Sequence, residues 1–297
     1  MRRCAFLTMD SLEGFVSDDE LVYPPLAARG WGVEAVPWRR PGVDWGRFEA
    51  VVIRTTWDYQ NAPEAFLSIL DQVQVSGTHL ENALDLVRWN MNKRYLRDLE
   101  RGGIALVPTV WGSDIGTMDE SEILRRLGTD EVVLKPEVGA NADHTYRLGR
   151  SSPGWRQAAV AFERRAYLAQ PFIASIVTEG EYSLVYFGGE FSHAIVKTPR
   201  AHDFRVQEEH GGIIRPVDPS PELVEAGRRV LAALAHVPLY ARADFVRLEG
   251  GVHALMELEL IEPSLYFRMD QGAPERFARA LDERFQSLPT GAGGVAP

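Results

Sequence analysis

Residues 239–265 read LYARADFVRLEGGVHALMELELIEPSL, and this stretch decides the fold that we expect for the chain. Two runs rich in strand-forming residues flank a turn at residues 249–251, which contains two adjacent glycines. Glycine takes positive φ angles without a steric cost, so paired glycines between two such runs are typical of a β-hairpin. The stretch therefore predicts two antiparallel strands joined by a tight turn.

Four charged side chains of this hairpin are expected on one face. Arg242 and Asp244 are two residues apart in the first strand, and Glu257 and Glu259 have the same spacing in the second. Residues two apart in a strand point to the same side of the sheet. Carboxylates packed so closely repel each other unless a cation lies between them. The pattern predicts a Mg²⁺ site that faces a polyphosphate; the alternative is a solvated face on which Glu257 and Glu259 simply meet water.

The composition excludes several classes of protein. The 297 residues are 45% hydrophobic and 25% charged, as in ordinary soluble globular proteins. The formal net charge of −10 argues against a nucleic acid or an anionic membrane as partner, but it leaves ATP open because a ligand responds to the local field. Cys4 is the only cysteine, which excludes an internal disulfide and predicts a cytoplasmic protein. No apolar run reaches the length that a membrane span requires.

Residues 1–89 predict a small α/β unit. Apolar runs at residues 3–9, 33–37 and 50–54 are expected to form strands, and the composition of the third predicts that it is buried. Helices are expected at residues 18–28, where Asp18 is a candidate N-cap, and at residues 63–73.

The third of these strands ends in a polar and aromatic cluster, RTTWDY at residues 54–59. Ligands of open α/β sheets bind at the carboxyl ends of the strands. Arg54, Thr56 and Asp58 are therefore candidates to bind the carboxylate and the amine of a substrate, with Trp57 and Tyr59 as walls of the site. The alternative is that Arg54 pairs with Asp58 and that Trp57 packs into a core.

The middle of the chain contributes two lysines. Residues 90–100 predict a helix with Lys93 in its first turn, where the helix dipole disfavours a cation unless an anion is bound nearby. Residues 131–136 predict a strand with Lys135 at its exit, and the loop at residues 137–146 contains several small residues. Such a loop lets backbone N–H groups approach phosphate oxygens, although a solvated loop is the alternative.

Further elements are expected around and beyond these lysines. Strands are predicted at residues 104–110, 167–173, 181–187 and 190–197, and helices at residues 121–127 and 220–235. The strand at residues 167–173 contains Pro171 and is either a hinge that presents backbone groups to a purine or a plain edge strand. Arg205, in a polar loop, is a candidate to bind a transferred phosphoryl group or a substrate carboxylate. The tail at residues 290–297 predicts disorder.

Taken in order, these features resemble the ATP-grasp superfamily. The match consists of Lys93, the Lys135–Pro136 pair with its small-residue loop, QPFI at residues 170–173, RAD at residues 242–244 and ELE at residues 257–259. The resemblance implies an α/β fold with a preATP-grasp domain at residues 1–89 and an ATP-grasp domain at residues 90–289, in which residues 108–172 form a small lid.

The resemblance also implies roles for individual residues. Lys93, Lys135, Gly139 and Ala140 would contact the phosphates of ATP, and Gln170, Phe172 and Ile173 would lie at the adenine. Asp244, Glu257 and Glu259 would hold Mg²⁺, and many ATP-grasp proteins have asparagine at the position of Glu259. Arg242 would face the transferred phosphoryl group and, with Lys135 and Arg205, completes the expected catalytic set.

Four stretches are similar to one group within this superfamily, namely RTTWDY, VRWNMNKRYL, DFRVQEEHGG and ELELIEPSLYF. The group includes the O-ureidoserine cyclo-ligase of cycloserine biosynthesis. The similarity implies an ATP- and Mg²⁺-dependent ligase that turns the carboxylate of an amino-acid-like small molecule into an acylphosphate and then an amide. The amine and the carboxylate would belong to one molecule or, as in glutathione synthetase and D-alanine–D-alanine ligase, to two. A nucleotide-binding protein without ligase turnover is the alternative of another class, and a homodimer is one oligomeric state that we consider.

Overall fold

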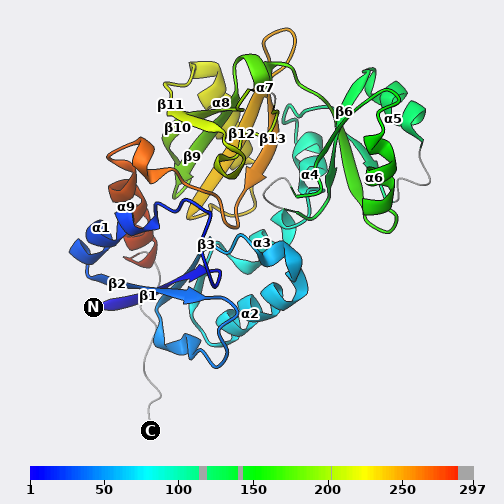
Figure 1. Cartoon of the computed structure of the whole chain (residues 1–297). Coiled ribbons are helices and arrows are strands. Elements are labelled where there is room, and N and C mark those ends of the chain that lie inside the picture. The colour runs from blue at the N-terminus through cyan, green and yellow to red at the C-terminus, as the bar shows by residue number, and fades with distance from the viewer. Residues whose placement is uncertain (114–118, 140–142, 202, 287–297) are drawn as a thin grey trace.

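The computed structural model describes residues 1–113, 119–139, 143–201 and 203–286, and these residues form an α/β protein with three sheets (Figure 1). The predicted α/β class is thereby confirmed. Ala140 and the tail at residues 290–297 lie outside the described residues. The predicted domain limits, 1–89 and 90–289 with a lid at 108–172, stay predictions.

The first sheet is parallel, with the strand order β2-β1-β3-β4. Its strands are β1 (Arg2–Thr8), β2 (Trp31–Pro37), β3 (Ala50–Thr55) and β4 (His79–Glu81), and the helices of this part of the chain are α1 (Tyr23–Ala28), α2 (Pro63–Val75) and α3 (Leu84–Asn90). Every residue of β3 is buried, as its composition predicts. β1 pairs with β3 as far as Thr55, whereas β4 pairs only with the first three residues of β3.

The helix predicted at residues 18–28 is divided in two. A short 3₁₀ helix covers Asp19–Val22, and α1 begins at Tyr23 with two prolines in its first turn. Proline lacks an N–H group and favours the start of a helix, which explains the break. Asp18 does not act as a side-chain cap; its carboxylate instead accepts a hydrogen bond from Arg268 at 2.8 Å.

The second sheet is antiparallel, with the strand order β5-β8-β6-β7. Its strands are β5 (Val110–Gly112), β6 (Glu131–Pro136), β7 (Tyr146–Gly149) and β8 (Tyr167–Pro171), and the helices of this part of the chain are α4 (Tyr95–Arg101), α5 (Glu120–Leu127) and α6 (Gly154–Ala161). Lys135 lies at the exit of β6, as predicted.

Two elements predicted between these sheets are wrong. The helix at residues 90–100 is interrupted, because α3 ends at Asn90, α4 begins at Tyr95, and Lys93 lies in the connection. Asn92 Oδ1 accepts a hydrogen bond from the Arg94 N–H at 2.9 Å, and such a local turn competes with the helix. Of the strand predicted at residues 104–110, only Val110 belongs to a strand, namely β5. Pro108 has no N–H group to donate to a neighbouring strand.

The third sheet is antiparallel, with the strand order β11-β10-β9-β12-β13. Its strands are β9 (Glu181–Phe187), β10 (Glu190–Thr198), β11 (Ile213–Pro216), β12 (Tyr240–Arg247) and β13 (His253–Glu259), and the helices of this part of the chain are α7 (Ser175–Thr178) and α8 (Pro221–Ala232). Both predicted hairpins, β9–β10 and β12–β13, are confirmed. The glycine pairs at their turns have positive φ angles of 58° and 85° in the first and 84° and 84° in the second.

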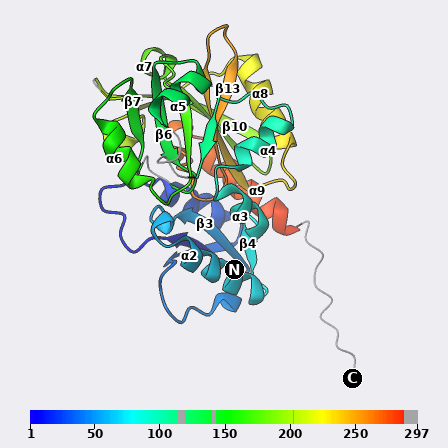
Figure 2. The same ribbon diagram turned by 90° about the vertical axis from the view of Figure 1, so that its right-hand side faces the viewer.

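The first and third sheets share a hydrophobic core. Buried side chains of β1, β9 and β12 pack with the last described helix, α9 (Ala273–Gln286), and they include Phe6, Val185 and Phe277. The Tyr240 hydroxyl, on β12, lies 2.6 Å from the carbonyl oxygen of Ile53 at the end of β3. Figure 2 shows the first sheet below the two antiparallel sheets. No helix of the described ranges is long and apolar enough to cross a membrane.

Candidate active site

A cavity lies between the three sheets and is lined by most of the residues that the sequence singles out. The space within it, including space open to solvent, is about 1450 Å³. The predicted residues that line the cavity are Lys93, Lys135, Gly139, Gln170, Phe172, Ile173, Arg205, Arg242, Asp244, Glu257 and Glu259.

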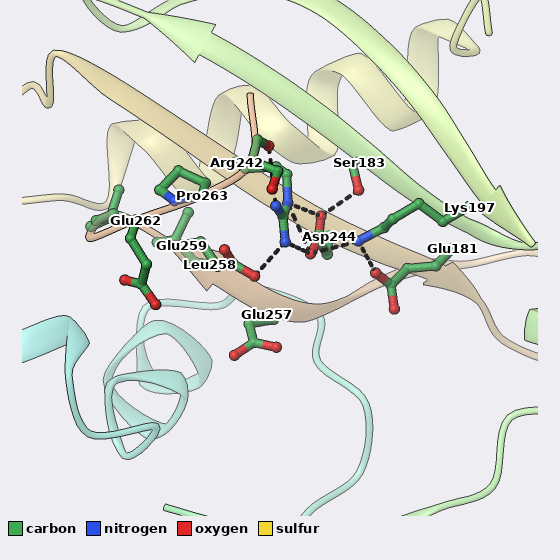
Figure 3. A network of polar contacts seen from close by, with 12 residues as sticks. Glu181, Ser183, Lys197, Arg242, Asp244, Glu257, Leu258, Glu259, Glu262 and Pro263 are labelled. Atoms are coloured by element: carbon green, nitrogen blue, oxygen red, sulfur yellow. Dashed lines mark hydrogen bonds and ion pairs between the residues drawn. The ribbon is translucent and has the colours of Figure 1, made fainter. Parts of the chain in front are cut away.

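The centre of the site is an ion network around Asp244 on β12 (Figure 3). Asp244 is 2% exposed, and its carboxylate accepts hydrogen bonds from Arg242 Nη2 at 3.0 Å and from Lys197 Nζ at 3.1 Å. Ser183 donates a further hydrogen bond at 2.5 Å, and Lys197 also pairs with Glu181 at 2.5 Å. Burial raises the pKa of Asp244, but the two cations outweigh burial and hold the pKa below its ordinary value. Asp244 is therefore a carboxylate at neutral pH.

The register of the β12–β13 hairpin brings the four charged residues together, as predicted. Arg242 is opposite Glu259, and Asp244 is opposite Glu257. The Arg242 guanidinium forms an ion pair with Glu259, and Lys93 Nζ lies 2.6 Å from Glu257. Because the two glutamates are engaged by cations and line the cavity, the alternative of a solvated face is wrong.

Glu257 and Glu259 differ in their ionisation. Burial raises the pKa of Glu257, but Lys93 and Lys135 outweigh burial, and the pKa ends below its ordinary value. For Glu259, burial outweighs the opposing effect of Arg242, and the neighbouring carboxylates add to it, so that the pKa rises to about 7. Glu257 is thus ionised at neutral pH, whereas Glu259 is close to its midpoint.

The residues fit a bound Mg²⁺ in part. Within the described ranges, no group of three or more His, Cys, Asp or Glu side chains is arranged to hold a metal ion. The oxygens of Asp244 are occupied by Arg242, Lys197 and Ser183, so this arrangement does not support the ligand role predicted for Asp244. The side chains of Glu257 and Glu259 are each 28% exposed and offer the oxygen donors that Mg²⁺ prefers. These two glutamates are the residues that would hold the ion.

Among the described residues, no direct contact neutralises the charge of Lys135. Its ammonium group has no hydrogen bond or ion pair with any residue in the described part of the chain. Burial lowers the pKa of Lys135, although Glu257 and Glu181 oppose this effect. An anion bound in the cavity would compensate the buried charge.

The residues predicted to lie at the adenine are found at the β6–β8 end of the cavity. Gln170 is 3% exposed, and its side-chain amide donates to Thr109 Oγ1 at 3.1 Å. The Arg147 guanidinium lies 3.5 Å from the ring centroid of Phe172. The carbonyl of Gly139 accepts a hydrogen bond from Lys93 Nζ at 2.9 Å. Lys93 therefore contacts both the start of the predicted phosphate loop and Glu257.

Three predicted substrate residues do not line the cavity. Arg54 is 2% exposed and donates to Asp19 at 2.8 Å, so the alternative in which it pairs with Asp58 is wrong. Thr56 is completely buried, and Asp58 accepts a hydrogen bond from the Trp38 indole at 2.7 Å. The segment at residues 54–59 turns its alternate side chains, Trp57 and Tyr59, toward the cavity. The predicted walls of the site are therefore in place, but the predicted ionic contacts are not.

Arg205 lies on the other side of the cavity, and it is paired. Its guanidinium lies 2.9 Å from the Asp203 carboxylate, and its side chain is 34% exposed. Arg205 has five N–H donors, so it can bind an oxyanion while it keeps this pair.

Helix side chains hold β13 in place along its outer edge. β13 is the last strand of its sheet, and an edge strand has unpaired backbone groups. The Asn90 side chain donates to the Leu258 carbonyl at 2.8 Å and accepts from the Leu260 N–H at 2.9 Å. The Tyr95 hydroxyl accepts from the Leu258 N–H at 2.8 Å. These contacts fix the strand that carries Glu257 and Glu259.

The sequence contains a signal for this site that motif reasoning missed. Only three of the 32 basic residues are lysines, and all three, Lys93, Lys135 and Lys197, line the cavity. Lysine has a compact ammonium charge, unlike the planar guanidinium of arginine. In a chain that uses arginine almost everywhere else, the retained lysines point to positions that require an ammonium group. Glu181 and Glu262, which also line the cavity, were likewise missed, since burial cannot be read from their local sequence.

Comparisons with known proteins identify relatives of this chain. A family model described as D-cycloserine synthetase DcsG, N-terminal domain, matches residues 4–82. The cycloserine biosynthesis protein DcsG of Streptomyces lavendulae is 33% identical over 289 residues, which are 89% of this chain and 93% of the relative. The crystal structure of D-cycloserine synthetase DcsG has a TM-score of 0.83 at 29% identity and covers 95% of this chain and 99% of its own. D-alanine–D-alanine ligase from Bacillus anthracis complexed with ATP has a TM-score of 0.67 at 16% identity, with 97% of each chain covered, and shows a shared fold.

Proposed function

The chain belongs to the DcsG family of ATP-grasp ligases, and from this premise we propose that it closes an amide bond within one amino-acid-like molecule, as an O-ureidoserine cyclo-ligase would. The predicted resemblance to the ATP-grasp superfamily is confirmed, and the protein is an ATP-dependent carbon–nitrogen ligase. The substrate, the intramolecular course and the roles of individual residues form the proposal.

One observation carries the proposal: the three lysines lie around the same cavity as Glu257 and Glu259. The negative charge of a nucleoside triphosphate is compensated by compact cations along its phosphates, and lysine is a common phosphate ligand. We assign Lys93 and Lys135 to the phosphates and the region of Gln170, Phe172 and Ile173 to the adenine. Arg242 is assigned to the transferred phosphoryl group.

Glu257 and Glu259 would hold Mg²⁺ in this assignment. When bound, the ion would neutralise charge on the phosphates during transfer. Lys93 now pairs with Glu257, and Arg242 pairs with Glu259. Arrival of ATP would therefore draw both cations toward its phosphates and free the two carboxylates for the ion.

The chemistry takes place in two steps. A substrate carboxylate oxygen attacks the γ-phosphorus of ATP, the bond to the leaving ADP oxygen breaks, and an acylphosphate forms. An amine-type nitrogen then attacks the acyl carbon, phosphate leaves, and the nitrogen loses a proton to give the amide. Lys135 and Arg242 stabilise the charge that develops on the transferred oxygens, while Trp57 and Tyr59 shield the acylphosphate from water.

The intramolecular course is tested by ADP release with chosen substrates. The purified protein with ATP and Mg²⁺ is supplied with each enantiomer of O-ureidoserine alone, and then with pairs of amino acids. We expect ADP with O-ureidoserine alone and a cyclic amide product in the mass spectrum. A strict requirement for two different molecules would instead support an intermolecular ligase. A cytoplasmic location stays a proposal, supported by the lone, buried thiol of Cys4.

A further inference from the structure

A buried carboxyl group near Trp57 is not used by the phosphoryl chemistry proposed above. Glu262 follows β13, lines the cavity and is 9% exposed. Its carboxyl group has no hydrogen-bond or ion-pair partner among the residues that the structure describes. Its backbone carbonyl accepts a hydrogen bond from the Trp57 indole at 2.8 Å, which fixes the segment. Figure 3 shows the Glu262 carboxyl group turned away from the Arg242–Asp244 network.

Four other acidic groups of this cavity differ from Glu262 because they have cations in contact. Glu181 and Asp244 pair with Lys197, Glu257 pairs with Lys93, and Glu259 pairs with Arg242. Burial raises the pKa of Glu262 well above its ordinary value, and the charge of Glu259 adds to the effect. A buried ionisable group without a partner is costly, so a cationic ligand would complete this site.

The position of Glu262 indicates which ligand brings that cation. In the assignment proposed above, the nucleotide lies at the β6–β8 end of the cavity beside Lys135 and Gln170, which leaves the part of the cavity lined by Trp57, Arg242 and Glu262. The second ligand is therefore expected between Trp57, Arg242 and Glu262. An amino-acid-like molecule carries a carboxylate, for which Arg242 offers a cation, and an ammonium group, for which Glu262 offers an anion.

We propose that the Glu262 carboxylate binds the ammonium group of the amino-acid-like substrate. The assignment rests on the substrate class proposed above. Glu262 thereby selects a substrate with an α-amino group, and it takes no part in the binding of ATP or Mg²⁺.

The test compares Glu262→Gln with the wild type in the ADP-release assay. Glutamine keeps the shape of the side chain and removes its charge. The variant should raise KM for O-ureidoserine by roughly 10–100-fold, the range for loss of a hydrogen bond to a charged group. KM for ATP and the Mg²⁺ requirement should not change. KM for 3-(ureidooxy)propanoic acid, which lacks the amino group, should also stay the same.

Glu249→Gln is the matched control, because Glu249 lies exposed in the turn of the β12–β13 hairpin. A second measurement needs no variant. The KM of the wild type for O-ureidoserine must be lower than its KM for the desamino analogue by roughly tenfold or more. Equal KM values for these two compounds would overturn the inference even if Glu262→Gln does not fold.

Two outcomes separate this inference from the proposed function. If the wild type releases ADP with O-ureidoserine and Glu262→Gln leaves its KM unchanged, or changes the Mg²⁺ requirement instead, only the role of Glu262 is overturned. If no amino-acid-like compound supports ADP release by the wild type, the proposed substrate class fails and the role of Glu262 fails with it.

Discussion

Replacement of Asp244 by asparagine tests whether this residue anchors the ion network or binds the metal. Asp244 is 2% exposed and contacts Arg242, Lys197 and Ser183. Asp244→Asn keeps the volume but leaves two buried cations with fewer counter-charges. Removal of one partner from a buried ion pair costs about 3–5 kcal/mol, a large part of a total stability of about 5–15 kcal/mol. For a protein of this size the loss corresponds to a fall in Tm of roughly 6–20 °C.

Urea unfolding, followed by circular dichroism, measures this change in the free energy of unfolding. Asp71→Asn is the control, because Asp71 lies 2.7 Å from Arg88 but both side chains are about half exposed, at 50% and 51%. Loss of such a surface pair costs about 0–1 kcal/mol. The anchoring role is refuted if Asp244→Asn unfolds within about 1 kcal/mol of the wild type while its Mg²⁺ requirement rises strongly.

Three further predictions follow from the geometry. Lys135→Met should lower kcat by roughly 10²–10³-fold in the ADP-release assay, because it removes a cation from the proposed phosphates. Asn90→Ala should destabilise the protein by about 1–3 kcal/mol in urea unfolding, because it leaves buried backbone groups of β13 unpaired. Burial raises the pKa of Glu81 to about 7, so the stability of the wild type falls as the pH rises from the ordinary pKa of 4.5 to that value. The free energy of unfolding of Glu81→Gln, relative to that of the wild type, should therefore be about 1–3 kcal/mol higher at about pH 8 than at about pH 5.

Each of these predictions has a control or an outcome that contradicts it. Arg150→Met removes an exposed cation that directly follows β7, in the same sheet as the strand of Lys135, and should leave kcat unchanged. Near-normal turnover of Lys135→Met would contradict its placement at the phosphates. If Asn90→Ala is as stable as the wild type, the hydrogen bonds of the Asn90 side chain do not stabilise the edge strand β13. A stability difference between Glu81→Gln and the wild type that is the same at both pH values would contradict the raised pKa of Glu81.

The hairpin and its charges could be predicted because they depend on local rules. The period of two in a strand places Arg242, Asp244, Glu257 and Glu259 on one face, and the glycine pair fixes the turn. Lys135 was found in the same way, since it ends a short apolar strand. Such features need only the neighbouring residues.

Other features depend on partners that are distant in the sequence. The pairing of Arg54 with Asp19 spans 35 residues, so the sequence offers only the nearer Asp58 as an alternative partner. The contacts of Asp244 with Lys197 and Ser183 come from two other strands, and they give the carboxylate a role different from that of Glu257. The Glu262 backbone carbonyl accepts a hydrogen bond from Trp57, which is 205 residues away in the sequence. Tertiary packing, not residue type, decides each of these.

Because all three lysines line one cavity, the site can also be labelled with reagents that react with amines. None of the three lysine side chains belongs to the exposed surface. A lysine-directed acylating reagent should therefore modify the lysines of this protein slowly and only inside the cavity, and a bound nucleotide should shield them. The fraction of each lysine that is modified, measured by peptide mass spectrometry, then reports the occupancy of the cavity by the nucleotide without a catalytic assay.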